Sequence, residues 1–127
     1  MARQVFLSYS SKDSKDAGRI CTALESAGIS CWMAPRDVEA GTDYPAEIVD
    51  AITSSTMFVL LLTEHSLASR HVLSEVGHAF NAGKPTLQFR VSSAPLSKEL
   101  DYFLAMAQWL DASDGGCTDQ NLSLIHI

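Results

Sequence analysis

The chain has 127 residues, which is a typical length for one domain. Hydrophobic residues make up 46% of it and charged residues 19%, a composition that excludes disordered and collagen-like classes. The formal net charge of −6 argues against a nucleic-acid partner bound without sequence preference, because such binding requires a basic surface.

The first half of the chain alternates between apolar strands and an amphipathic helix. Val5–Tyr9 is a near-continuous apolar run, typical of a strand that is covered on both faces. A helix is predicted over Asp16–Ala27, where apolar residues recur at helical spacing, and Gly28 ends it. A short strand over Ile29–Met33 and a turn-rich loop over Ala34–Tyr44 follow.

The second half continues the same alternation. Pro45 suits the first position of a helix, and Met57–Thr63 is another buried strand. A helix is predicted over Ser69–Ala82, a fourth strand over Thr86–Val91 and a short fifth over Ala107–Leu110. The alternation of strands and helices indicates an α/β fold with a doubly wound parallel sheet and right-handed crossovers.

The end of the chain does not continue the pattern. Residues 111–121 are polar, and residues 122–127 (LSLIHI) are apolar. An extra strand, an ordered tail and residues foreign to the natural domain all stay open as interpretations. We therefore divide the chain into a domain over residues 4–111 and a C-terminal tail of unknown role over residues 112–127.

Cysteine use and hydropathy predict a cytoplasmic protein without a membrane partner. The start of the chain has no apolar run long enough for a signal peptide, and the longest run, Met57–Leu62, is far shorter than the roughly 20 residues that span a bilayer. Cys21, Cys31 and Cys117 are odd in number and form no C-x-x-C pair, so neither a disulfide framework nor a zinc ribbon is indicated.

The edge of the sheet at the carboxyl ends of the strands is where a ligand is expected. It brings together residues 8–15, 34–44 and 64–71. The first segment has no Rossmann or P-loop glycine motif, which excludes those phosphate sites. It holds Ser8–Ser10 where a response-regulator receiver needs a carboxylate pair, and Leu62–Thr63 stand where that fold needs an aspartate, so a receiver is excluded too.

Two loops at this edge carry side chains suited to a ligand. Hydroxyls and cations that fit phosphate or ribose oxygens gather in the first loop, at Ser10, Ser11, Lys12, Ser14 and Lys15. The alternative is a solvated loop that caps the next helix. The second loop is about ten residues long against the usual 2–6, which favours a functional role. Its notable residues are Arg36, Asp37, Gly41 and Tyr44.

The helix after the third strand holds a cluster of titratable residues. Its predicted apolar side consists of Val72, Val76, Ala79 and Phe80. Off that side, His71, Glu75 and His78 stand at i, i+4 and i+7 and share one face. Three interpretations stay open at this point: a solvated helix face, a metal site and a catalytic carboxylate.

Four segments carry the most specific patterns of the chain. They are VFLSYSSKD at Val5–Asp13, CWMAPRDVEAGTDYPAEI at Cys31–Ile48, FVLLLTEHSLAS at Phe58–Ser69 and LSEVGHA at Leu73–Ala79. In this order they resemble the TIR domain in its bacterial form, over about residues 5–91 and more weakly to residue 110. The resemblance implies a flavodoxin-like α/β fold, a five-stranded parallel sheet with helices on both faces, and it makes residues 34–44 the BB loop of the family.

The TIR family contains protein-interaction adaptors and enzymes that consume NAD+. The enzymes carry a glutamate in a motif resembling S-x-x-x-x-S-E-V, where Glu75 stands. The resemblance implies a hydrolase that splits the nicotinamide–ribose bond into nicotinamide and ADP-ribose, or a cyclic ADP-ribose isomer. A carboxylate stabilises the oxocarbenium-like ribose electrostatically. NAD+ is then a substrate, and neither a cofactor nor a metal is expected.

The resemblance also implies which other residues take part. Substrate binding is expected from Tyr9, Ser10, Lys12, Trp32, Arg36 and His71. Assembly through the BB loop is expected from Asp37, Gly41 and Tyr44. Many enzymatic members carry an aromatic residue, commonly Trp, where this chain has His71. An imidazole there is expected to stack on a base or to bond to Glu75, and the identity of the product is left open.

The second function that the resemblance implies is a non-catalytic module that binds other TIR domains. Residues 1–36 hold five basic and three acidic side chains, whereas residues 91–127 hold one basic and five acidic. This asymmetry suits head-to-tail self-association, which does not close on itself. The resemblance further implies a role in anti-phage or stress signalling, and a separate sensor or effector protein as a partner.

Overall fold

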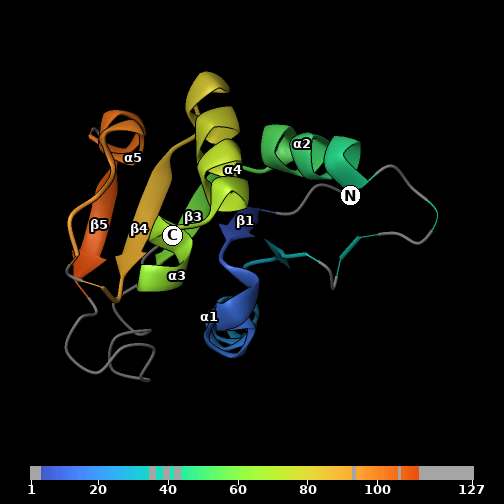
Figure 1. Cartoon of the computed structure of the whole chain (residues 1–127). Coiled ribbons are helices and arrows are strands. Elements are labelled where there is room, and N and C mark those ends of the chain that lie inside the picture. The colour runs from blue at the N-terminus through green and yellow to red at the C-terminus, as the bar shows by residue number, and fades with distance from the viewer. Residues whose placement is uncertain are drawn as a thin grey trace.

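A parallel β-sheet of five strands runs through the molecule in the order β2-β1-β3-β4-β5 (Figure 1). The computed structural model describes residues 4–34, 37–38, 41, 44–92, 94–105 and 107–111. The strands are β1 (Val5–Ser8), β2 (Cys31–Trp32), β3 (Met57–Leu62), β4 (Thr86–Arg90) and β5 (Gln108–Asp111). This strand order is the flavodoxin-like arrangement. The predicted α/β fold with a parallel sheet is therefore confirmed.

The helices follow the predicted periodicity, and three short ones add to it. The helices are α1 (Ser14–Ser26), α2 (Tyr44–Ser54), α3 (Glu64–Leu67), α4 (Arg70–Asn81) and α5 (Lys98–Leu104), with a 3₁₀ turn η1 (Ser11–Asp13) before α1. The sequence did not predict η1, α3 or α5, because one or two turns are too short to show an apolar period. The strand β2 is shorter than predicted, since the amide of Ile29 donates to the carbonyl of Leu24 and so completes the end of α1.

Two apolar layers cover the sheet, one on each face. In Figure 1, α1 lies on one side of the sheet, and α2, α4 and α5 lie on the other. The α1 side packs on strand residues that include Val5, Leu7, Val59, Leu61 and Phe89. The opposite side packs on strand residues that include Phe6, Trp32, Phe58, Leu60 and Leu62. Alternate residues of β1 and β3 thus face opposite layers, which is why these strands are apolar throughout.

The buried side of α4 differs from the predicted one at its two edges. Val72, Val76 and Ala79 are buried as expected, but Glu75 is buried with them and Phe80 is 43% exposed. Glu75 has a buried hydrogen-bond partner, the Ser8 hydroxyl, as described below. Phe80 packs instead on the ring of Phe103, at 5.2 Å between centroids.

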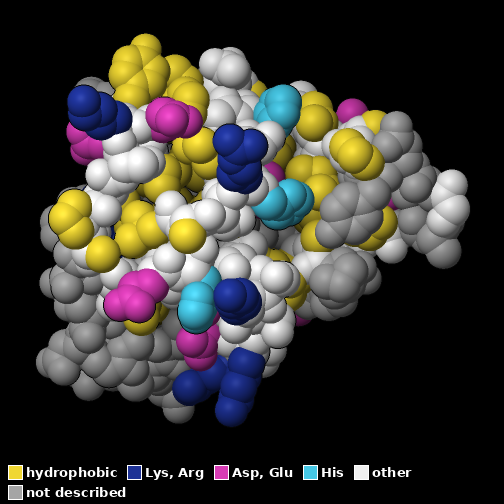
Figure 2. Space-filling view, in the orientation of Figure 1, with side chains coloured by type: hydrophobic (Ala, Val, Ile, Leu, Met, Phe, Trp, Pro, Cys, Tyr) yellow, Lys and Arg dark blue, Asp and Glu magenta, His cyan; other side chains and the backbone are white. Residues whose placement is uncertain are grey.

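The exposed rings of Phe80 and Tyr102 extend the apolar surface over α4 and α5, where Figure 2 shows apolar side chains gathered. Within the described part of the chain, no helix has the length and apolar character needed to cross a membrane. The predicted division at residue 111 stays a prediction, and residues 112–127 lie outside the described residues.

Candidate active site

The site lies at the carboxyl end of β1, against the first two turns of α4. Ser8 is the last residue of β1 and pairs in register with Leu60 of β3. The helix α4 begins after Ser69, whose hydroxyl accepts a hydrogen bond from the amide of Val72 at 3.2 Å. This cap fixes the start of the helix, and Glu75 then stands one turn further along, facing β1.

Glu75 is a buried carboxylate with a partner on each oxygen. The Ser8 hydroxyl donates to Oε1 at 2.6 Å, and Nε2 of His71 lies 2.8 Å from Oε2. The residue is only 5% exposed. The interpretation of a solvated helix face is therefore wrong for Glu75, whereas the predicted contact between His71 and Glu75 is present.

Ser8 is the site residue that sequence reasoning missed. The sequence places it at the ligand edge and at a position where a receiver carries a carboxylate, but gives it no role of its own. The signal that could have found it is a serine inside an apolar strand, because a buried hydroxyl requires a hydrogen-bond partner. The sequence alone does not say which residue supplies that partner, since Glu75 lies 67 positions away.

The hydrogen bond to Glu75 raises the pKa of His71 above its ordinary value. Partial burial of the imidazole opposes this rise in pKa, and the negative charge of Glu75 adds to it. The imidazole therefore stays protonated to a higher pH than an isolated histidine, and the contact with Glu75 is an ion pair while it does.

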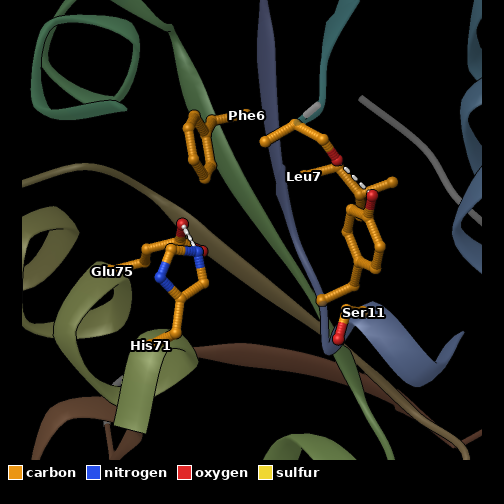
Figure 3. A pocket seen from close by; sticks show the side chains of 7 residues that line it. Phe6, Leu7, Ser11, His71 and Glu75 are labelled. Atoms are coloured by element: carbon orange, nitrogen blue, oxygen red, sulfur yellow. Dashed lines mark hydrogen bonds and ion pairs between the residues drawn. The ribbon is translucent and has the colours of Figure 1, made fainter. Parts of the chain in front are cut away.

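A cavity of about 100 Å³ opens beside the carboxylate. It is lined by Phe6, Leu7, Tyr9, Ser11, Ala34, His71 and Glu75. Figure 3 shows His71 and Glu75 projecting from α4 on one side of this cavity, with Leu7 and Ser11 on the other. The cavity thus joins a buried negative charge to hydroxyl groups, an arrangement that can stabilise a developing positive charge.

A second cavity, of about 150 Å³, adjoins the same carboxylate between α2 and α4. It is lined by Pro45, Ile48, Val49, His71, Ser74, Glu75 and His78. The metal interpretation required these histidines and the carboxylate to converge on one ion. Within the described ranges, no group of three or more His, Cys, Asp or Glu side chains is placed to hold a metal.

Tyr9 and Asp37 fasten the start of the 34–44 loop. The Tyr9 hydroxyl donates to the carbonyl of Ala34. The Asp37 carboxylate accepts from the amide of Met33 at 3.0 Å, and the amide of Asp37 donates to the carbonyl of Met33 at 3.0 Å. Gly41 has φ +82°, which suits a glycine at a turn. Arg36 and the side chain of Tyr44 lie outside the described residues.

Three of the predicted substrate-binding residues are not brought to the cavity. Ser10 is buried and caps η1, accepting from the amide of Lys12, and Lys12 is exposed. Trp32 is buried in the core, where its ring stacks on Phe6 at 5.1 Å between centroids. Ser11, which the first loop was expected to offer as one of several hydroxyls, lines the cavity instead.

Comparison with known proteins decides the family. The chain matches the TIR domain family over residues 5–125. The chain belongs to the TIR domain family. Its bacterial type stays a prediction.

Solved structures show the same fold as this TIR domain. The TIR domain of the Toll-related receptor TRR-2 from Hydra magnipapillata is 19% identical, with a TM-score of 0.77 over 89% of this chain and 86% of its own. The TIR domains of the activated Roq1 resistosome, which recognises the pathogen effector XopQ, are 21% identical, with a TM-score of 0.62 over 72% of this chain and 60% of their own.

An enzyme is among the structures that share the TIR domain's fold. The CMP N-glycosidase BcmB from Clostridium botulinum is 17% identical, with a TM-score of 0.58 over 83% of both chains. A sequence search of curated proteins finds no match to this TIR domain.

Proposed function

We propose that this TIR domain cleaves NAD+ at the bond between nicotinamide and ribose, releasing nicotinamide and ADP-ribose or a cyclic ADP-ribose isomer. The observation that carries the proposal is the Glu75 carboxylate, which is buried at the carboxyl edge of the sheet and lines a cavity. The likeness of fold to an N-glycosidase acting on a nucleotide supports the same class of bond cleavage.

Cleavage of the bond between nicotinamide and ribose requires little from the protein beyond a negative charge held beside the ribose. Departure of nicotinamide neutralises the pyridinium, so the leaving group requires no strong general acid. The ribose becomes oxocarbenium-like, and a carboxylate beside it lowers the energy of that positive charge most effectively where water is excluded. Water then adds at the anomeric carbon to give ADP-ribose, or a group of the same substrate adds to give the cyclic product.

The size of the cavity limits which part of NAD+ it takes. Sites for whole small-molecule ligands span about 300–1,000 Å³, and this cavity is about 100 Å³. We therefore place one ring of the substrate beside Glu75. The diphosphate would then lie along the exposed first loop, where Lys12 offers a positive charge.

Substitution of Glu75 tests the proposal. Purified protein is incubated with NAD+ and the release of nicotinamide is followed by chromatography, which also separates ADP-ribose from its cyclic isomer. Glu75→Gln is expected to lower kcat by about 100-fold or more, because the amide keeps the shape and loses the charge. Glu64→Gln is the matched control, since Glu64 is an exposed carboxylate on α3. Equal release from wild type and Glu75→Gln would remove Glu75 from the mechanism.

A second candidate function is binding to other TIR domains through the BB loop. The contacts of Tyr9 and Asp37 fix the base of this loop, and the Roq1 resistosome is an assembly that contains TIR domains. Light scattering is expected to show a mass that grows with concentration, and Asp37→Ala to weaken that growth by freeing the loop. A monomer at every concentration, with and without an NAD+ analogue, would exclude assembly. The signalling role, the separate sensor and the cytoplasmic location stay predictions.

A further inference from the structure

Both oxygens of Glu75 are occupied in this structure. Oε1 accepts from the Ser8 hydroxyl at 2.6 Å, and Oε2 lies 2.8 Å from Nε2 of His71. A ribose hydroxyl that approaches the carboxylate must therefore share or replace one of these two partners. In this structure each oxygen of the carboxylate thus already has one partner from the protein.

The two partners differ in their freedom to leave. Ser8 is 1% exposed and sits in the sheet, paired with Leu60 of β3, so its side chain has no space to move into. The side chain of His71 is 54% exposed and stands in the first turn of α4. A rotation about its side-chain bonds carries the imidazole into water without disturbing the backbone.

The imidazole also stands where the two cavities meet. His71 and Glu75 are the two residues that line both of them. One cavity opens toward Tyr9 and Ala34, and the other toward Ile48 and Val49 of α2. Each is smaller than the roughly 300 Å³ of an ordinary ligand site. Removing the imidazole from between them would give one larger cleft with the Glu75 carboxylate in its wall.

We propose that His71 is a gate on this site: its imidazolium holds Oε2 of Glu75 and separates the two cavities, and its departure frees that oxygen for a substrate hydroxyl and joins the cavities. The proposal rests on the proposed function for the identity of the substrate. In this proposal the ion pair between His71 and Glu75 is the closed state, and both substrate binding and a rise in pH favour its opening.

The direction of the pH effect follows from the charges around the imidazole. Among the described residues that line the two cavities, the other titratable groups are Glu75 and His78 of α4 and Tyr9 after β1. The Tyr9 hydroxyl is engaged by Ala34, and α2 contributes Pro45, Ile48 and Val49, which do not titrate. Glu75 raises the pKa of His71. The closed ion pair therefore dominates below that raised pKa and is lost as the pH rises through it.

A pH profile of NAD+ cleavage tests the gate. In the wild type, kcat/KM is expected to fall about tenfold per pH unit below the His71 pKa, because the gate must lose its proton to open. His71→Ala and His71→Gln are both expected to lose this acid limb, so that their activity relative to wild type is greatest at the acid end. His78→Ala is expected to keep the limb. A uniform loss of activity at every pH in both His71 variants would show a positioning role and overturn the gate.

Nuclear magnetic resonance of the His71 ring supplies a readout that does not depend on turnover. Adding ADP-ribose to the wild type is expected to lower the pKa of His71 toward its ordinary value, because the bound ligand separates the ring from Glu75. If ADP-ribose shifts other resonances of the protein, and so is bound, but leaves the His71 titration unchanged, the gate is wrong whether or not NAD+ is cleaved. A protein that shifts His71 on adding ADP-ribose but releases no nicotinamide would keep the gate and overturn the proposed reaction.

Discussion

The buried carboxylate of Glu75 determines which hydrogen-bond donors must lie around it. A carboxylate withdrawn from water is tolerated only when donors replace its hydration, and Ser8 and His71 are those donors. The helical spacing of four residues was enough to predict that His71 and Glu75 share a face. The contact of Glu75 with Ser8 of β1 could not be predicted from the sequence, because contacts between residues far apart in the chain depend on how the whole sheet is paired.

Ser8→Ala should lower the free energy of unfolding by about 1–3 kcal/mol near neutral pH, because it leaves Oε1 of Glu75 buried without its donor. Urea denaturation measures the change. In a Glu75→Gln background the same substitution should cost less, since the neutral amide needs the hydroxyl less than a carboxylate does. Ser74→Ala, on the exposed side of α4, is the control and should stay within about 0.5 kcal/mol. Equal costs in both backgrounds would mean that Ser8 does not act on Glu75.

The elements of the fold could be predicted where they are long enough for the spacing of apolar residues to be recognised. Apolar runs marked β1 and β3, and helical spacing marked α1 and α4. The short helix α3 depends on reciprocal hydrogen bonds between Thr63 and Ser66, which hold one turn without any apolar period. The apolar period of α4 predicts burial of Phe80 and exposure of Glu75. The structure instead buries Glu75, which accepts a hydrogen bond from the Ser8 hydroxyl, and leaves Phe80 43% exposed.

Two glycines, one in α1 and one just after it, should respond in opposite ways to substitution by alanine. Gly18 lies within the helix, and an added methyl group would meet nothing within 4 Å. Gly18→Ala should therefore stabilise the protein by about 0.5–1 kcal/mol through better helix propensity. Gly28, just after the helix, has φ +82°, so Gly28→Ala should destabilise it by about 1–2 kcal/mol. Thermal denaturation of both variants measures the changes. A Gly28→Ala protein as stable as wild type would contradict the left-handed backbone at this turn.

At the scale of the whole molecule, the net charge of −6 conceals an uneven distribution. The basic excess of residues 1–36 and the acidic excess of residues 91–127 lie at opposite ends of the chain. If copies associate head to tail, these regions attract each other over distances that salt screens. Association measured by light scattering should therefore weaken as ionic strength rises from 0.05 to about 0.5 M. Association that is unchanged or strengthened by salt would point to apolar contacts instead.

The contact between Ser8 and Glu75 also depends on the register in which β1 pairs with β3. Side chains alternate along β1, so a slip of one residue against β3 would turn Ser8 to the α1 face. Glu75 would then face an apolar strand side chain in place of its hydroxyl donor, and a charge without a donor is strongly disfavoured there. A chain that folds with β1 out of register would therefore lose stability together with the arrangement of the Glu75 carboxylate on which the proposed function depends. The Ser8 hydroxyl thus both supports the Glu75 carboxylate and favours one register of β1 against β3.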